Sequence, residues 1–223
     1  MDLGTAVSDR YHALRVAMVE VQLRGRGIRD PRVLAAMERG PRHEFLGPEF
    51  QREAYEDRPL PIGHGQTVSQ PYIVAAMLEA LELQPSDRVL EVGTGSGYQT
   101  ALLAELAAQV YSIERHAPLA ERARQTLERL GYRSVEIVVG DGTEGLPAAA
   151  PFDAILVSAA APRIPPPLLE QLAEGGRMIV PVGFCEGQEL ELVRKQQGQP
   201  CVTRLDACRF VPLIGREGFP SGW

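Results

Sequence analysis

Three acidic residues in the middle of the chain each follow a short apolar run, and their types and spacing could bind a nucleoside. Glu91 ends an apolar run that leads directly into the glycine-rich turn at residues 93–97. Glu114 lies about 20 residues farther along, the spacing at which a carboxylate accepts hydrogen bonds from ribose hydroxyls. Asp141 stands between two glycines, where it could accept a hydrogen bond from an adenine amino group. Each acid alone could be an ordinary strand end or turn, but the ordered set predicts a nucleoside pocket.

The residues around the glycine-rich turn indicate which ligand the pocket holds. A buried strand, a glycine turn and a helix place backbone amides around a ligand. Tyr98 follows the third glycine, where a dinucleotide-binding turn requires a small residue, and this argues against NAD. Glu91 would repel a pyrophosphate but would attract an ammonium or sulfonium cation. S-adenosylmethionine carries both cations, and we therefore expect it as the cofactor.

Strands and helices alternate through the middle of the chain, which indicates a parallel sheet covered by helices. Strands are predicted at 89–91, 110–114, 135–139, 153–157 and 177–181, and helices at 100–108, 117–130 and 167–172. No helix separates 188–194 from 202–207, so these segments should pair antiparallel at the sheet edge, followed by an extended loop at 210–215. We expect an α/β fold with a doubly wound, mostly parallel sheet and an antiparallel C-terminal edge.

Two helices are predicted ahead of this sheet. Apolar residues recur at helical spacing from residue 8 to 24, and Asp30 followed by Pro31 is typical of the start of a second helix that runs through residue 37. A chain of 223 residues can bury one substantial core. We expect a single domain over 1–223, with an N-terminal helical cover at 1–60, a cofactor-binding core at 61–182, and a C-terminal hairpin and substrate loop at 183–223.

Composition narrows the classes of partner. A net charge of −6 and an isoelectric point near 5.3 argue against a nucleic-acid partner. The three cysteines and four scattered histidines lack the spacing of a disulfide framework or a zinc site, so we expect no metal. We find neither a signal-peptide pattern nor an apolar run of about 18 residues. We therefore expect a cytoplasmic protein without a membrane partner.

The segment RPLPIGHGQTVSQPY at residues 58–72 precedes the glycine turn and would shape the substrate side of the pocket. Ser69 has two interpretations, a serine of the site or an ordinary helix N-cap with Pro71 in the first turn. His64 lies between two glycines and has no recognisable base or nucleophile partner in sequence, so it could also be a simple loop residue.

Several motifs, taken in order, resemble the protein-L-isoaspartate O-methyltransferase family. They are GHGQTVSQPY (63–72), VLEVGTGSGYQTA (89–101), IE (113–114), GDG (140–142), FDAILVSAA (152–160), GGRMIVPVG (175–183) and RFVPL (209–213). The resemblance covers about residues 57–215 and implies a Rossmann-like class I methyltransferase fold. It also implies methyl transfer from S-adenosylmethionine to the free α-carboxylate of L-isoaspartyl residues in damaged proteins and peptides, which starts repair through a succinimide. The chain departs from the family pattern at 45–50 and after 215, and both departures concern peptide preference.

The resemblance also assigns roles to residues. Ser69 would be the catalytic serine, in contact with substrate and cofactor, and Glu114 would hold the ribose. The residues implied to contact the cofactor are Gln66, Thr67, Val68, Ser69, Glu91, Gly93, Thr94, Gly95, Ser96, Glu114, Arg115, Asp141, Gly142 and Ala159. The residues implied to contact the substrate are His64, Ser69, Val211, Pro212 and Leu213, the last three by pairing with its backbone.

This chemistry needs few catalytic side chains, because a carboxylate is already ionised at neutral pH and requires no general base. Three other functions share some of these features. A small-molecule methyltransferase would keep every cofactor residue. A base methyltransferase would carry an Asp/Asn-Pro-Pro-aromatic tetrad where this chain has Ser-Ala-Ala-Ala at 158–161. A non-catalytic protein could use the same pocket to recognise isoaspartyl partners.

Overall fold

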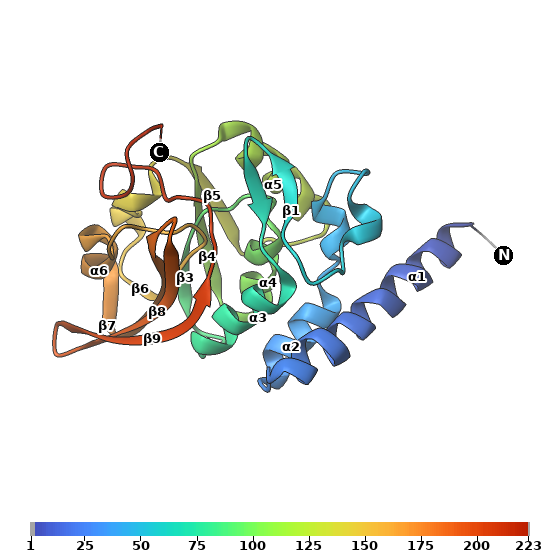
Figure 1. The fold of residues 1–223 in the computed structure, drawn as a ribbon, viewed down its shortest axis with the longest axis horizontal. Coiled ribbons are helices and arrows are strands. Elements are labelled where there is room, and N and C mark those ends of the chain that lie inside the picture. The colour runs from blue at the N-terminus through green and yellow to red at the C-terminus, as the bar shows by residue number, and fades with distance from the viewer. Residues whose placement is uncertain (1–2, 223) are drawn as a thin grey trace.

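The computed structural model describes residues 3–222 and is built around a seven-stranded sheet (Figure 1). The strand order is β5-β4-β3-β6-β7-β8-β9, with parallel pairing from β5 through β7 and antiparallel pairing of β7, β8 and β9. The strands are β3 Arg88–Val92, β4 Gln109–Glu114, β5 Val135–Val139, β6 Phe152–Val157, β7 Leu172–Phe184, β8 Gly187–Gln196 and β9 Gln199–Cys208. The predicted mostly parallel sheet with an antiparallel C-terminal edge is confirmed.

Six α-helices flank the sheet or precede it in the described chain. They are α1 Leu3–Ala17, α2 Pro31–Arg39, α3 Pro71–Ala80, α4 Tyr98–Leu106, α5 Ala117–Arg129 and α6 Pro166–Gln171. The helix predicted at 8–24 is instead α1 followed by a π-helical turn, Met18–Leu23, and a 3-10 turn, Arg24–Arg26. Helix α2 begins as predicted, because Asp30 accepts hydrogen bonds from the amides of Arg32 and Val33.

Both faces of the central strands are buried, as expected for parallel strands covered by helices. Val89 packs in one apolar cluster with α2, α3 and α4, whereas its neighbours Leu90 and Val92 pack in a second cluster on the opposite face. Side chains alternate along a strand, so Glu91 shares the face of Val89. The order of strands places a topological switch point between β3 and β6, where the chain turns from one side of the sheet to the other. A ligand site is expected at the carboxyl ends of these two strands.

Two elements differ from the sequence prediction. A short hairpin, β1 Leu60–Gly63 and β2 Gln66–Val68, lies in the segment at residues 58–72, for which we predicted no strands. Its tip residues Gly63, His64 and Gly65 all have positive φ, which glycine adopts without strain and a tight hairpin turn requires. Strand β7 begins at Leu172, five residues before the strand predicted at 177–181, and Gly175-Gly176 form an irregular stretch between its two paired segments.

Candidate active site

The glycine-rich turn forms the floor of the site. Gly93, Gly95 and Gly97 have φ values of 96°, 55° and 88°, in the left-handed region that glycine tolerates. The amide of Gly93 donates to the carbonyl of Ile113 at 2.8 Å, which ties the turn to β4. Helix α4 then begins at Tyr98, whose buried ring packs edge to face on Phe45. Tyr98 therefore contacts the N-terminal cover and leaves the ligand side of the turn open.

Glu114, at the end of β4, holds the turn in place from the other side. Its Oε2 accepts a hydrogen bond from the Gly95 amide at 2.9 Å, and its Oε1 accepts one from the His116 amide at 2.8 Å. The side chain is buried yet lines the cavity. Each carboxylate oxygen can accept a second hydrogen bond, so Glu114 can also bind vicinal hydroxyls.

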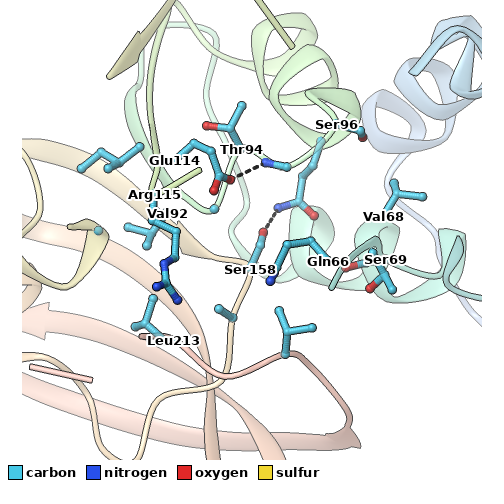
Figure 2. Close-up of a pocket in the computed structure, with 18 of the residues that line it drawn as sticks. Gln66, Val68, Ser69, Val92, Thr94, Ser96, Glu114, Arg115, Ser158 and Leu213 are labelled. Atoms are coloured by element: carbon cyan, nitrogen blue, oxygen red, sulfur yellow. Dashed lines mark hydrogen bonds between the residues drawn. The ribbon is translucent and has the colours of Figure 1, made fainter. Parts of the chain in front are cut away.

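A cavity opens between this turn, the β1–β2 hairpin and the segment after β9 (Figure 2). Figure 2 shows Glu114 and Thr94 on one side of it and Val68 and Ser69 on the other. It is lined by Gln66, Thr67, Val68, Ser69, Val74, Val92, Gly93, Thr94, Gly95, Ser96, Gln99, Ile113, Glu114, Arg115, Gly142, Ser158, Ala159, Val211, Pro212, Leu213 and Ile214. Most residues expected at the site therefore meet here; Glu91, Asp141 and His64 are not among the lining residues.

Glu91 faces the protein interior and not the cavity. Its side chain is fully buried under α4, where Oε2 accepts hydrogen bonds from the Thr100 hydroxyl at 2.5 Å and the Ser112 hydroxyl at 2.6 Å. Side chains alternate along β3, so Glu91 lies on the same face as Val89, the face that packs against α4. The strand also continues to Val92, one residue farther than predicted. We predicted direct contact with a cofactor cation, and the structure gives this carboxylate different neighbours.

Hydrogen bonds through two pairs of polar side chains nevertheless connect Glu91 to the residues that line the cavity. Ser112 bonds Thr94 at 2.5 Å, and Gln99 donates to Ser158 at 2.6 Å while approaching Glu91 at 3.5 Å. Thr94, Gln99 and Ser158 all line the cavity. Sequence analysis missed Gln99 and Ser158, although their positions just after the glycine turn and just after β6 place them beside the switch point.

Burial raises the pKa of Glu91 to about 7, although the hydrogen bonds from Ser112, Thr100 and Gln99 act in the opposite direction. The native state therefore holds this proton more tightly than the unfolded state does, and stability should fall as pH rises from about 4.5 to about 7. The difference corresponds to about 3 kcal/mol.

We expect Glu91→Gln to remove this pH dependence because an amide does not ionise. The measurement is the free energy of unfolding by urea, for both proteins, at pH 5 and pH 8. The wild-type value minus the variant value should decrease by about 2 kcal/mol between the two pH values. If wild type and variant differed by the same free energy of unfolding at pH 5 and pH 8, folding would not raise the pKa of Glu91, and the prediction would be wrong.

Asp141 holds the C-terminal tail, beside the cavity. Its Oδ1 accepts from the Thr143 amide at 2.9 Å and the Thr143 hydroxyl at 2.7 Å, and its Oδ2 accepts from the Arg216 amide at 2.8 Å. Burial alone would raise the pKa of Asp141, but these hydrogen bonds and the charge of Arg115 lower it. Gly142 lies on the cavity wall, where a Cβ atom would come within 2.4 Å of Val92 Cγ1. Because Val92 approaches so closely, this position has no room for a side chain and requires glycine.

His64 lies at the exposed tip of the β1–β2 hairpin. Its ring stacks on His116, with 5.3 Å between centroids. Arg122 fixes the same hairpin by donating to the carbonyl of Ile62 at 2.6 Å. Contact between His64 and a substrate stays a prediction, since the structure places the ring outside the cavity wall.

Ser69 occupies the junction between β2 and α3. The N-cap of α3 is Gln70 and makes no side-chain capping bond, so the interpretation of Ser69 as the N-cap is wrong. The Ser69 carbonyl accepts a hydrogen bond at 2.8 Å from Arg42, a fully buried arginine that also donates to the Ala54 carbonyl at 2.7 Å. Arg42 was missed because nothing in its local sequence distinguishes it from a surface arginine.

The segment after β9 forms the last wall. The Val211 carbonyl accepts from the Ala160 amide at 2.8 Å, and the Leu213 amide donates to the Ala160 carbonyl at 2.7 Å. These two groups are therefore engaged within the protein, and any pairing of residues 211–213 with a substrate backbone must use other groups of the segment.

A second cleft adjoins the cavity. The residues that line it are Pro59, Thr67, Ser69, Gln70, Ile73, Ser158, Ala207, Cys208, Arg209, Phe210 and Val211. Thr67, Ser69, Ser158 and Val211 line both spaces. Two ligands could thus meet at Ser69, one in each space.

The cavity fits S-adenosylmethionine by the chemistry of its walls. Glu114 offers acceptors for ribose hydroxyls, and Val92, Ile113 and Leu213 offer apolar surfaces for a base. Thr94 and Ser158 add hydroxyls beside the glycine turn. A doubly wound sheet with this turn after its central strand and an acid at the end of the next strand defines a Rossmann-like class I methyltransferase.

Comparison with known proteins narrows the class to one family. The chain belongs to the protein-L-isoaspartate(D-aspartate) O-methyltransferase family, whose model matches residues 15–218. It is 60% identical to the protein-L-isoaspartate O-methyltransferase of Koribacter versatilis over 92% of each chain. It is 52% identical to the enzyme of the same name from Aeropyrum pernix, over 99% of this chain and 86% of that one.

Solved structures agree with this assignment. A structure described as a protein-L-isoaspartate O-methyltransferase superposes with a TM-score of 0.82 at 31% identity, over 92% of this chain and 67% of the other. A Plasmodium falciparum structure, described as a beta-aspartate methyltransferase in complex with S-adenosyl-L-homocysteine, gives a TM-score of 0.79 at 28% identity, over 90% of this chain and 98% of the other. The resemblance inferred from the motifs is confirmed.

Within residues 3–222, no helix is long and apolar enough to span a membrane, and no group of three metal-ligating side chains is arranged to hold a metal ion.

Proposed function

We propose that this chain transfers a methyl group from S-adenosylmethionine to the free α-carboxylate of L-isoaspartyl residues in proteins and peptides. Membership of the family supports the reaction and the cofactor. The observation that carries the assignment to this site is the meeting of two spaces, the cavity and the second cleft, at Ser69. The cavity has the walls of a nucleoside site, and the adjoining cleft would take a segment of polypeptide.

Different residues of the cavity would bind different parts of the cofactor. Glu114 would accept hydrogen bonds from the ribose, and Gly142 would let the base lie against the backbone. Thr94, Gly95 and the rest of the glycine turn would face the methionine part. Asp141 and His64 would act at the margin, because Asp141 holds the tail and His64 lies at the hairpin tip.

S-adenosylmethionine, when bound, supplies a methyl group on a positively charged sulfur. The substrate carboxylate is already ionised at neutral pH, so the chain needs no general base. Ser69 would orient this carboxylate by donating a hydrogen bond from its hydroxyl. Val68, Val211 and Leu213 would exclude water from the reaction, and rate enhancement would come from alignment of the two reactants.

The product is a methyl ester, whose methoxide group leaves far more readily than the oxide of a carboxylate. We propose that the backbone amide nitrogen of the next residue then attacks the ester carbonyl without further help, which releases methanol and forms a succinimide. Water opens this ring in part to normal aspartate. Mass spectrometry of an isoaspartyl peptide incubated with enzyme and S-adenosylmethionine tests this course. We expect methyl ester, then succinimide, then aspartyl peptide in that order. Formation of a stable ester that never yields aspartate would contradict a repair role.

The chain would work as one domain, because one apolar cluster joins residues of the N-terminal cover to those of the sheet. It would act in the cytoplasm, in keeping with Cys185, Cys201 and Cys208, which are all free.

Replacement of Ser69 with alanine tests its role as the orienting donor. We expect kcat to fall by about 10- to 100-fold, the loss of one well-placed hydrogen bond in the transition state, with little change in the Kd for S-adenosylhomocysteine. The measurements are steady-state kinetics on an isoaspartyl peptide and calorimetric binding. Ser8→Ala is the matched control, because it makes the same change far away in the sequence, in α1. Equal losses in kcat and in affinity would reject this role.

A further inference from the structure

The second cleft beside Ser69 contains a single charged side chain among the residues that line it, that of Arg209. Arg209 is exposed, and among the side chains of residues 10–222 its guanidinium has no partner in an ion pair or hydrogen bond. The other lining residues are neutral or apolar. An unpaired guanidinium in this cleft would attract a negatively charged ligand, although the chain as a whole has a net charge of −6.

Arg204, the preceding arginine in the chain, differs from Arg209 because it already faces two acids. It lies on β9, 3.7 Å from Glu189 and 3.8 Å from Glu191. On the opposite side of the cleft, Gln70 bonds Asp57, but this acid is already paired with Arg26 at 2.6 Å. No acid of the cleft therefore neutralises Arg209.

The backbone beside Arg209 is held firmly. The next residue, Phe210, donates its amide hydrogen to Gln188 at 2.7 Å, and its carbonyl accepts from the same side chain at 3.2 Å. Val211 then lines both the cleft and the cofactor cavity. The guanidinium thus extends from a fixed base, two residues from the place where the two spaces meet.

We propose that Arg209 selects isoaspartyl substrates that carry an acidic side chain close to the isoaspartyl residue. The inference rests on the proposed function and specifies which substrates the same site prefers. A glutamate or aspartate beside the reacting residue would pair with Arg209 at the edge of the cleft, whereas a lysine there would be repelled. Because Arg209 does not line the cofactor cavity, the effect belongs to substrate binding and should appear in KM.

The test uses three isoaspartyl peptides that differ at one flanking position, which holds Glu, Gln or Lys, with a second series varied on the other flank. Wild-type enzyme should show kcat/KM in the order Glu, Gln, Lys in at least one series. Each step should be about threefold, the size of an exposed ion pair, and should shrink as salt is added. Arg209→Gln should flatten the order and Arg209→Glu should reverse it.

Arg204→Gln is the matched control, since it removes the same charge from β9, outside the cleft. It should keep the wild-type order. An equal kcat/KM for all peptides in both series, or an unchanged order in Arg209→Glu, would overturn the inference while leaving the proposed function intact. Absence of methyl transfer to every peptide would overturn both.

Discussion

Replacement of Glu114 with alanine is expected to weaken the binding of S-adenosylhomocysteine by at least about 100-fold. The variant loses a carboxylate that would bind ribose and that holds the amides of Gly95 and His116 at 2.9 and 2.8 Å. Hydrogen bonds to a charged group contribute about 1.5 to 3 kcal/mol each, so losing two of them toward the ligand costs about 3 kcal/mol or more. This corresponds to at least about 100-fold in Kd.

Isothermal titration calorimetry measures this loss directly. Glu136→Ala serves as the control, because Glu136 is an exposed carboxylate on the adjacent strand β5 and does not line the cavity. Its Kd should match that of the wild type. A Glu114→Ala protein that binds within about threefold of wild type would show that the ribose lies elsewhere.

Replacement of Arg42 with alanine should have the largest effect on stability. Arg42 is fully buried, donates to the carbonyls of Ala54 and Ser69, and lies 4.9 Å from the ring centroid of Tyr98. Burial lowers its pKa to about 10, against the raising effects of Tyr98, Tyr55 and Asp57. Relief of this cost would favour the variant, but alanine leaves two carbonyls without a donor and a cavity of nearly a whole side chain. We expect the second effect to dominate, with a loss of about 3 kcal/mol.

The measurement is thermal unfolding, in which a loss of this size should lower Tm by about 10 °C. Because Arg42 holds the Ser69 carbonyl, kcat on an isoaspartyl peptide should fall as well, even at temperatures where the variant is folded. Arg52→Ala, an exposed arginine in the same segment, should leave both quantities unchanged. Normal kcat in folded Arg42→Ala would separate this arginine from the positioning of Ser69.

Much of the fold could be predicted because its signals are local. The bounds of β5 match the prediction, and α5 differs by one residue at its end, since apolar periodicity and caps mark both elements. The glycine turn and Glu114 could be predicted because a phosphate- or nucleoside-type turn needs glycine at fixed spacing and an acid at the next strand end. These features depend on residues close together in the chain.

The features that could not be predicted depend on contacts between distant segments. The surroundings of Glu91 depend on which elements cover its face of β3, and its partners Thr100 and Ser112 lie 9 and 21 residues away in the chain. The role of Arg42 depends on Ser69, which lies 27 residues away. Asp141 is bound by the Arg216 amide, 75 residues farther along the chain. The periodicity of apolar residues does not predict contacts between such distant residues.

The most direct test of the central claim is transfer of labelled methyl from S-adenosylmethionine to two matched peptides, one with L-isoaspartate and one with ordinary aspartate. The proposed function predicts base-labile label on the isoaspartyl peptide alone, and its loss in Glu114→Ala. Label on neither peptide, in a protein that binds S-adenosylhomocysteine, would contradict the claim and favour a small-molecule substrate or a binding role.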